Sequence, residues 1–179
     1  MADTLRFLYE QGVFETAIKI CNIAEGGCGN YFTLLSDICY LRGTSHMECN
    51  RPEQAIEDQL LARQHFLTAC ARSEVGDRDV REVKTLGILG HGHQCKGEFA
   101  QAEQIYRESI GIWQIHKFPG RPAIWELGLT LSLIFQSKFS DAENILDSIL
   151  DERAASYGPF DTISTMYVYH LRTVVAMLI

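Results

Sequence analysis

A short pattern recurs four times along the 179-residue chain. A glycine or polar residue opens it, an aromatic residue or proline follows two positions later, and an alanine stands three positions after that. The alanines are Ala17, Ala55, Ala102 and Ala142, spaced 38, 47 and 40 residues apart. Periods of about 20 to 50 residues are typical of architectures in which stacked units bury a shared apolar core. We therefore expect a repeat protein.

Each recurrence is preceded by another segment whose apolar residues have helical spacing. The clearest is Leu86-x-x-Leu89-Gly90-x-x-His93, which comes just before the pattern at Gly97. Each unit would therefore consist of a helix, a tight turn and a second helix. A glycine on the first helix and the alanine on the second allow the backbones to approach closely, while the aromatic residue fills the space beside the turn. The predicted fillers are Phe14, Phe99 and Phe139.

Loops that carry glycine and proline divide the chain into these units. The sequence predicts an all-α fold, a right-handed α-solenoid of about four helix-turn-helix hairpins plus one unpaired C-terminal helix. We expect a single helical repeat domain over residues 1–179, with units at 1–27, 30–74, 78–117 and 121–156 and a partial unit at 160–179. In the fourth unit, Ser140-Asp141-Ala142-Glu143 has the spacing of a capping box, which predicts that Ser140 caps the second helix.

The third unit resembles the tetratricopeptide repeat (TPR) at Leu86, Leu89, Gly90, His93, Ala102 and Tyr106. The spacing of 38 to 47 residues is similar to the extended repeats of kinesin light chains. Tyr157-Gly158-Pro159-Phe160-Asp161-Thr162 is similar to the Gly-x-x-His-Pro-x-Thr junction of those repeats. The resemblance implies a superhelix whose concave wall, built from the first helix of each unit, binds peptides.

The family register also implies which side chains line that wall. They are Asp37, Tyr40, Thr44 and Met47 in the second unit, Lys84, His91 and Gln94 in the third, and Ile124, Leu127, Leu131 and Ile134 in the fourth. The wall would change from polar to apolar along the chain. TPR proteins that bind chaperone C-termini use Lys, Asn and Arg at such positions, and here only Lys84 matches. We therefore expect a different kind of partner.

The predicted last helix, from Asp161 to Ile179, has no partner helix after it. Its apolar residues would cover most of its surface: Ile163, Met166, Tyr167, Val168, Leu171, Val174, Val175 and Leu178. Solenoids normally end in a capping helix with a polar outer face. The apolar end therefore predicts a truncated fragment, a homodimer through this helix, or docking of another domain, with truncation favoured.

His91, His93 and Cys95 form the most suggestive cluster for chemistry, because His91 and Cys95 lie four residues apart on one helix face. A zinc site needs three or four ligands, and no further ligand has a converging spacing. Cys39 and His46 would lie about 11 Å apart along a helix, too far for a nucleophile and its base. We therefore expect no enzyme, no metal and no cofactor. A metal-dependent enzyme or sensor centred on His91, His93 and Cys95 is the alternative.

Composition narrows the function further. The chain has 16 Lys and Arg against 23 Asp and Glu, a net charge of −7, and no basic cluster, which argues against nucleic acid as a partner. No apolar run of about 18 residues is present to span a membrane, and no signal peptide pattern opens the chain. We expect a cytoplasmic protein, with a nuclear location left open. The 6 cysteines form no CxxC pair and are expected to be free thiols.

The leading hypothesis is a protein-interaction scaffold without catalytic activity. Its groove would bind a peptide or amphipathic helix of another protein. A regulatory arm of a larger switch protein is a further hypothesis. Trp113 and Trp125 flank the loop at 117–122 and could form a recognition platform, although we favour packing between adjacent hairpins.

Overall fold

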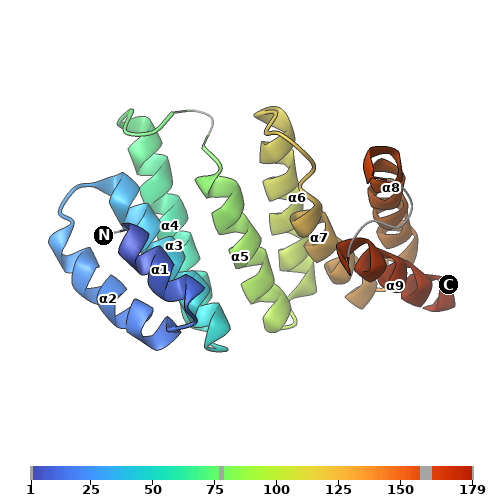
Figure 1. Cartoon of the computed structure of the whole chain (residues 1–179), viewed down its shortest axis with the longest axis horizontal. Helices are drawn as coiled ribbons and strands as arrows, with labels where there is room; N and C mark the ends of the chain where they lie inside the picture. The colour runs from blue at the N-terminus through green and yellow to red at the C-terminus, as the bar shows by residue number, and fades with distance from the viewer. Residues whose placement is uncertain (1, 77–78, 158–162, 179) are drawn as a thin grey trace.

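The computed structural model describes residues 2–76, 79–157 and 163–178, and within these ranges every regular element is a helix. The helices are α1 (Ala2–Glu10), α2 (Phe14–Gly27), α3 (Phe32–Glu48), α4 (Pro52–Ala71), α5 (Arg81–Cys95), α6 (Phe99–Ile115), α7 (Ala123–Phe135), α8 (Phe139–Tyr157) and α9 (Ile163–Leu178). Each helix packs against the next, and together they form one elongated row (Figure 1). The arrangement confirms the predicted all-α solenoid.

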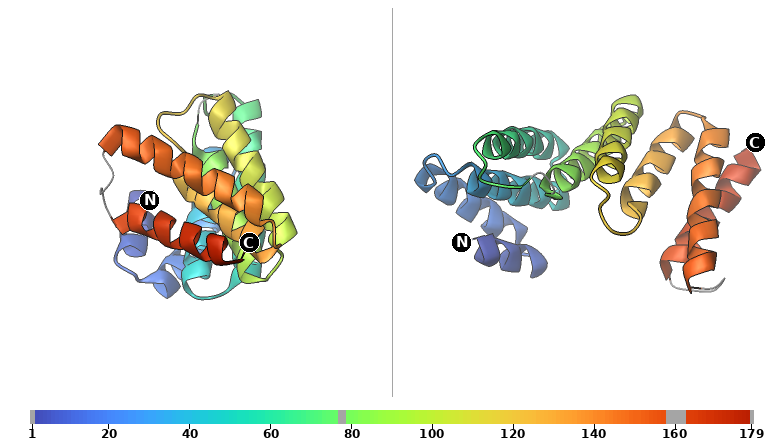
Figure 2. Two further views of the ribbon diagram at one scale, coloured as in Figure 1. Left: turned by 90° about the vertical axis from the view of Figure 1, so that its right-hand side faces the viewer. Right: turned by 90° about the horizontal axis from the view of Figure 1, so that it is seen from above.

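The odd-numbered helices share one face of this row. Contacts join α1 to α3, α3 to α5 and α5 to α7, in addition to those between consecutive helices. Viewed from above, the helices follow a curved row with α1 and α9 at its two ends (Figure 2). Residues of the odd-numbered helices line neighbouring cavities on one face of this row, which we call the concave face.

The first residue of the recurring pattern closes the first helix of each hairpin. Gly12, Asn50, Gly97 and Ser137 adopt left-handed backbone conformations with φ of 73°, 56°, 76° and 59°. At the first turn the amide of Val13 donates to the carbonyl of Leu8 at 3.0 Å, and the other three turns repeat this bond at 2.9 Å. The bond belongs to the Schellman motif, which needs a residue at positive φ. This need explains why glycine or a small polar residue opens every copy of the pattern.

The alanines of the pattern are buried, none more than 1% exposed, as the close helix approach predicts. Beyond them the described part of the chain holds two apolar clusters. The N-terminal cluster contains Leu5, Cys21, Ala24, Cys28, Leu35, Ile38 and Leu41. The C-terminal cluster contains Ala102, Tyr106, Leu129, Leu133, Ala142, Leu146, Ile149, Val168, Leu171 and Val175. The solenoid is thus held together by local cores.

The predicted aromatic fillers lie beside the turns. Phe14 packs on Tyr9 with ring centroids 5.4 Å apart, and Phe99 stacks on Phe135 at 4.5 Å. Phe139 is half-buried against the C-terminal cluster. Each ring therefore fills space near the point where the chain reverses, as predicted.

The predicted cap at Ser140 is wrong. Helix α8 begins at Phe139, so Ser140 lies inside its first turn. The amide of Ala142 donates to the carbonyl of Lys138 at 3.2 Å, which makes Lys138 the capping position. The reason is the turn itself, because left-handed Ser137 returns the chain to a helix after a single further residue.

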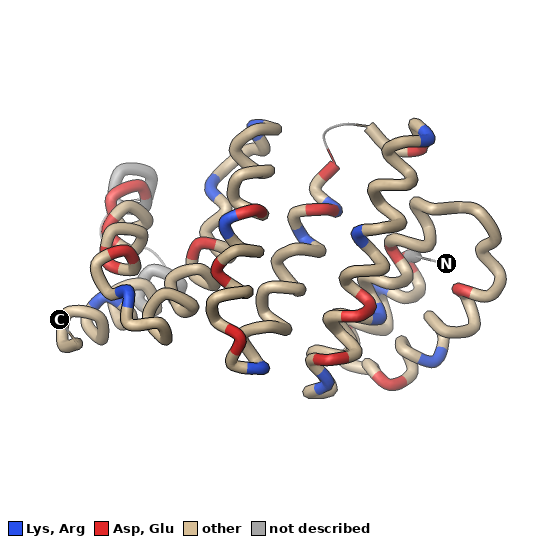
Figure 3. Tube along the Cα trace, turned by 180° about the vertical axis from the view of Figure 1, so that it is seen from behind, with Lys and Arg blue, Asp and Glu red and all other residues tan. Residues whose placement is uncertain are grey.

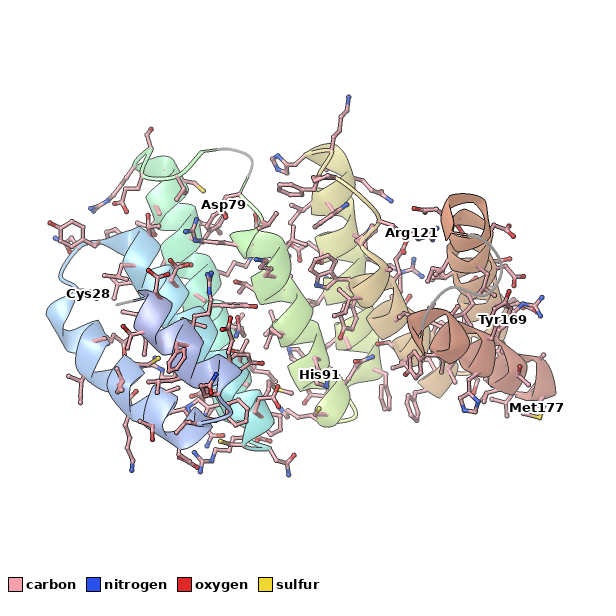
Figure 4. The ribbon with its side chains drawn as sticks, viewed as in Figure 1. Cys28, Asp79, His91, Arg121, Tyr169 and Met177 are labelled. Carbon is pink, nitrogen blue, oxygen red and sulfur yellow. The ribbon has the colours of Figure 1, made fainter. Side chains whose placement is uncertain are left out.

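Helix α9 packs against α8 and places Val168, Leu171 and Val175 in the C-terminal cluster. On its other side, side chains such as Tyr169 and Met177 are exposed at the outer end of the row (Figure 4). The predicted junction at 158–162 and the side chains of Ile163 and Met166 lie outside the described residues. Among the described helices, none combines the length and apolar character that crossing a membrane requires.

Candidate binding groove

Three adjoining cavities follow the concave face. Two lie at its N-terminal end between α1, α3 and α5, and one lies between α5, α7 and α9. Tyr40 on α3 and Lys84 on α5 line all three. The cavities are therefore parts of one groove, and we call its two regions the polar end and the apolar cavity.

The polar end is organised by Arg81 at the start of α5. Its Nε donates to Asp37 Oδ1 at 2.8 Å, and Nη1 pairs with Asp79. Asp79 also accepts the backbone amide of Arg81 at 2.9 Å, which fixes the start of the helix. Arg6 and Lys84 line the same space, and within the described part of the chain neither has an acidic partner. Two cations are therefore free to meet a ligand.

Tyr40 lies where the polar end meets the apolar cavity. Burial raises the pKa of its hydroxyl, and the nearby Arg6 opposes part of that rise. The phenol is therefore protonated at neutral pH and can donate a hydrogen bond into the groove. It offers a ligand a neutral polar contact between the cations and the apolar wall.

The apolar cavity has a volume of about 500 Å³. Besides Tyr40, its aliphatic and aromatic lining residues are Ile88, Tyr106, Ile124, Trp125, Leu127, Leu131 and Tyr167. Ile124 is 72% exposed although it is large and apolar. His91 also lines the cavity and is exposed, on the half of α5 opposite the end at which Asp79 lies (Figure 4). A cavity of this size and character suits an apolar anchor group.

The predicted wall residues fall into two groups, which differ in how many positions each residue precedes the left-handed residue at the end of its helix (Asn50, Gly97 or Ser137). Those 13, 10 and 6 positions before it line the groove: Asp37, Tyr40, Thr44, Lys84, His91, Ile124, Leu127 and Leu131. Those 3 positions before it line none of the three cavities: Met47, Gln94 and Ile134. At about 100° per residue the fourth position has turned about 80° from the first. It therefore reaches the side of the helix that meets a neighbour.

Gln94 shows the consequence most clearly. Its Nε2 donates to the carbonyl of Gly128 at 2.7 Å and to Ser132 Oγ at 2.8 Å, while its Oε1 accepts the Tyr106 hydroxyl at 3.0 Å. Its amide is thus fully used between α5 and α7. Ile134 packs on the C-terminal cluster, and Met47 is half-buried at the end of α3.

Several groove residues were missed by the sequence reasoning. Arg6 stands 6 positions before Gly12, the same place that Thr44, His91 and Leu131 occupy in their units, so the register could have found it. Tyr106 comes from a second helix, for which the family register predicts no groove contact. Tyr167 precedes no turn of the pattern, so it had no register position.

The two tryptophans pack together, with ring centroids 5.2 Å apart. Trp113 Nε1 donates to the carbonyl of Gly120 at 3.0 Å, which holds the loop before α7. Trp125 lies over Gly87, where an added Cβ would come within 2.0 Å of its Nε1. Packing is therefore the role of Trp113, while Trp125 also forms part of the apolar wall.

The residues of the metal and nucleophile hypotheses do not converge. His93 Nδ1 lies 2.6 Å from Glu98 Oε2, whereas His91 and Cys95 are exposed. In the part of the chain that the structure describes, no three His, Cys, Asp or Glu side chains are grouped to hold a metal. Burial raises the pKa of Cys39 to about 12, and its Sγ faces Glu25 at 3.9 Å. Cys39 is therefore a protonated thiol at neutral pH.

Comparison with protein-family models and with curated proteins finds no match. Solved structures do match. Two crystal structures of a Podosopora anserina protein, described as a kinesin light chain with nearly identical TPR-like repeats, share the architecture. Their sequence identities are 9% and 10% and their TM-scores 0.77 and 0.74, and each alignment covers 99% of this chain and 84% of the other. The chain therefore has the TPR-like repeat fold that its resemblance to the tetratricopeptide repeat implies.

Proposed function

We propose that this chain is a protein-interaction scaffold without catalytic activity, and that its groove binds a peptide or amphipathic helix of another protein. One observation carries the proposal: polar end and apolar cavity are continuous, because Tyr40 and Lys84 belong to both. A single elongated ligand can therefore touch both. Protein suits this groove better than nucleic acid, since the chain carries a net charge of −7. A cytoplasmic location belongs to the same proposal.

The apolar cavity supplies the affinity in this proposal. Burying apolar surface stabilises a complex by roughly 25 cal/mol per Å², and Ile124 and Leu131 are available for such burial. An amphipathic helix places apolar side chains three and four residues apart, so that one face can enter the cavity. The unpaired Arg6 and Lys84 then fix its direction rather than its strength.

The test is selection from a displayed library of helical peptides, followed by affinity measurement on matched variants. Ile124→Glu places a charge in the groove, whereas Ile23→Glu makes the same change on α2, where the isoleucine is 78% exposed and lines none of the cavities. We expect Ile124→Glu to weaken binding at least tenfold, since a buried anchor contributes more than about 1.4 kcal/mol. His91→Asp should weaken it less, and Ile23→Glu should leave it unchanged. Equal affinities for the Ile124 and Ile23 variants would reject the groove.

The outer face of α9 supports a second contact, either a homodimer or a docked domain. Met177 is 73% exposed and Leu178 51% exposed on this face. Sedimentation equilibrium of the wild type and of Met177→Asp measures it. A dimer that Met177→Asp converts to monomer supports self-association through α9, and a dimer that persists in Met177→Asp rejects it.

A further inference from the structure

Tyr106 is unusual among groove residues because it belongs to α6, whereas the other residues that line the apolar cavity belong to odd-numbered helices. It is 4% exposed, and its ring lies between α5 and α7. A Cβ added at Gly90 would lie 2.9 Å from the Cζ atom of the ring, and one added at Gly128 would lie 2.4 Å from it. The ring thus occupies the space that side chains at Gly90 and Gly128 would otherwise fill, and it lines the apolar cavity between α5 and α7.

The hydroxyl of the same residue joins three helices. It donates to Gln94 Oε1 on α5 at 3.0 Å, and Gln94 Nε2 donates to the Gly128 carbonyl and to Ser132 Oγ on α7 at 2.7 and 2.8 Å. Every one of these groups is at least half-buried. Breaking the chain of bonds would leave buried polar atoms without partners, so it holds α5 and α7 at one separation.

The equivalent position differs in the other units. Cys21, Gln59 and Leu146 stand four residues after their alanines, where Tyr106 stands after Ala102. Gln59 faces Gly43 and donates to the Tyr40 carbonyl at 3.1 Å, but it lines none of the three cavities. The third unit alone places an aromatic ring here, and the apolar cavity lies directly beside it.

We propose that Tyr106 determines which anchor groups the apolar cavity accepts. Its ring is the floor of the cavity and limits its depth, while its hydroxyl acts through Gln94 to keep α7 at the distance from α5 that leaves the cavity open. The inference rests on the proposed function, because the anchor belongs to the bound peptide or helix. Tyr106 is a specificity-determining residue in this account, and Gln94 is a positioning residue.

The chain contains a spectroscopic reporter for this cavity. It has 2 tryptophans. Trp125 lines the cavity, whereas Trp113 does not and has its Nε1 on the Gly120 carbonyl. The relative shifts of the two indole N–H signals in a ¹H–¹⁵N correlation spectrum therefore separate a probe in the cavity, which affects Trp125 first, from one elsewhere. Toluene and 1-methylnaphthalene serve as a small and a large probe of the same apolar chemistry.

The experiment titrates both probes into the wild type, Tyr106→Leu, Tyr106→Phe and Gln94→Leu, with Gln59→Leu as the control for the same change outside the cavity. In the wild type we expect saturable shifts that are larger at Trp125 than at Trp113, which packs on Trp125 with ring centroids 5.2 Å apart, and we expect toluene to be preferred. Tyr106→Leu should move the preference toward 1-methylnaphthalene at least tenfold, because the floor is lowered. Tyr106→Phe and Gln94→Leu should lower the affinity for both probes at least threefold, because the open cavity is less populated. The ratio of the two affinities should stay as in the wild type. Gln59→Leu should match the wild type.

An unchanged preference in a folded Tyr106→Leu variant would overturn the inference. If that variant does not fold, unchanged affinities for both probes in Tyr106→Phe and Gln94→Leu would overturn it instead. A wild type in which neither probe shifts Trp125 rejects the cavity, and with it the inference. Failure of the peptide library with these probe results intact rejects only the proposed partner.

Discussion

Both halves of the solenoid bury an apolar cluster behind the same hairpin backbone, but the N-terminal half also buries an ionic network. Between α2, α3 and α4 the centre is Arg42, which is 8% exposed. Its Nε and Nη2 donate to Asp58 Oδ1 at 2.9 and 2.6 Å, and its Nη1 donates to Asn22 and to Glu25. In the fourth unit Leu129 stands where Arg42 stands in the second, 8 positions before the left-handed turn residue, and it belongs to the cluster of Leu133, Leu146 and other aliphatic side chains.

The difference shows that the repeat fixes helix geometry and leaves the interior free to vary. Small residues at the alanine positions bring the helices together in both halves, and what fills the remaining space follows no shared rule. Burying an ionic network costs free energy because the charges lose water, and their mutual pairing offsets this cost. Burying aliphatic side chains stabilises the fold through the apolar surface removed from water. Acidic residues lie along α4, α6 and α8, and therefore in both halves, so their distribution along the chain does not follow this contrast (Figure 3).

The largest expected effect comes from removing the ionic centre. Arg42→Met leaves Asp58 without its main partner inside the protein, and breaking a buried pair in this way costs about 3 to 5 kcal/mol. Urea unfolding followed by circular dichroism measures the change.

The matched control is Arg51→Met, because Arg51 pairs with Glu15 where both side chains are at least 40% exposed. We expect it to cost less than about 1 kcal/mol. The double variant Arg42→Met, Asp58→Leu should recover much of the loss, since no uncompensated charge is left at that position. Equal costs at Arg42 and Arg51 would show that the buried network contributes no more than a surface pair.

Truncation in the apolar half should be nearly as costly but local. Leu133 is fully buried, and Leu133→Ala should cost about 2 to 5 kcal/mol through lost contacts and a cavity. Because solenoid units contact only their neighbours, hydrogen exchange should quicken in α7 and α8 far more than in α3 and α4. Equal acceleration in both halves would mean that the chain unfolds as one unit and that the contrast between its halves has no energetic consequence.

Glycines at helix contacts sharpen the comparison at smaller cost. An added Cβ at Gly128 meets three atoms of the Tyr106 side chain at 2.4 to 2.7 Å, whereas one at Gly43 meets only the Gln59 amide so closely, at 2.6 Å, with Asp58 Cβ at 3.0 Å and the Ala55 carbonyl oxygen at 3.2 Å. Gly128→Ala should therefore cost about 1 to 3 kcal/mol and Gly43→Ala less. Gly111→Ala on α6 meets nothing within 4 Å and should gain up to about 1 kcal/mol of helix propensity. Thermal unfolding ranks the three, and a Gly43 variant worse than the Gly128 variant would contradict the assignment.

Local rules made the fold readable from the sequence. The left-handed turn residues and buried alanines each depend on a few neighbouring positions, so their pattern was visible without knowledge of long-range contacts. Ser140 shows where this fails. The capping-box spacing is present, but the Schellman turn at Ser137 restarts the helix two residues earlier than a cap at Ser140 would. Two local rules competed there, and the backbone geometry of the turn prevailed.

Only some of the groove residues could be predicted from the sequence, and the reason is geometric. Side chains 13, 10 and 6 positions before the turn line the cavities, whereas Gln94, 3 positions before it, is hydrogen-bonded to α6 and α7. Tyr106 and Arg42 depend on contacts between helices. Arg42 lies in the segment Leu41-Arg42-Gly43, and no neighbouring residue in the sequence indicates that Asp58 and Glu25 bind its guanidinium group. Such pairings follow from packing and not from spacing.

The smallest expected effect is a pH dependence confined to the N-terminal half. Burial lowers the pKa of His46, and Arg51 and Arg42 add to this, while Asp58 and Glu15 oppose it. The unfolded chain therefore takes up this proton more readily than the folded one. The stability that neutral His46 contributes is present above the unfolded pKa of about 6.5 and is lost as pH falls through the lower folded pKa. Each pKa unit of difference corresponds to about 1.4 kcal/mol. Urea unfolding at pH 7.5 and 5.5 measures how much stability is lost between the two pH values, and we expect a smaller loss in His46→Gln than in the wild type. An identical pH dependence in both proteins would assign the effect to other groups and remove His46 from the contrast between the two halves.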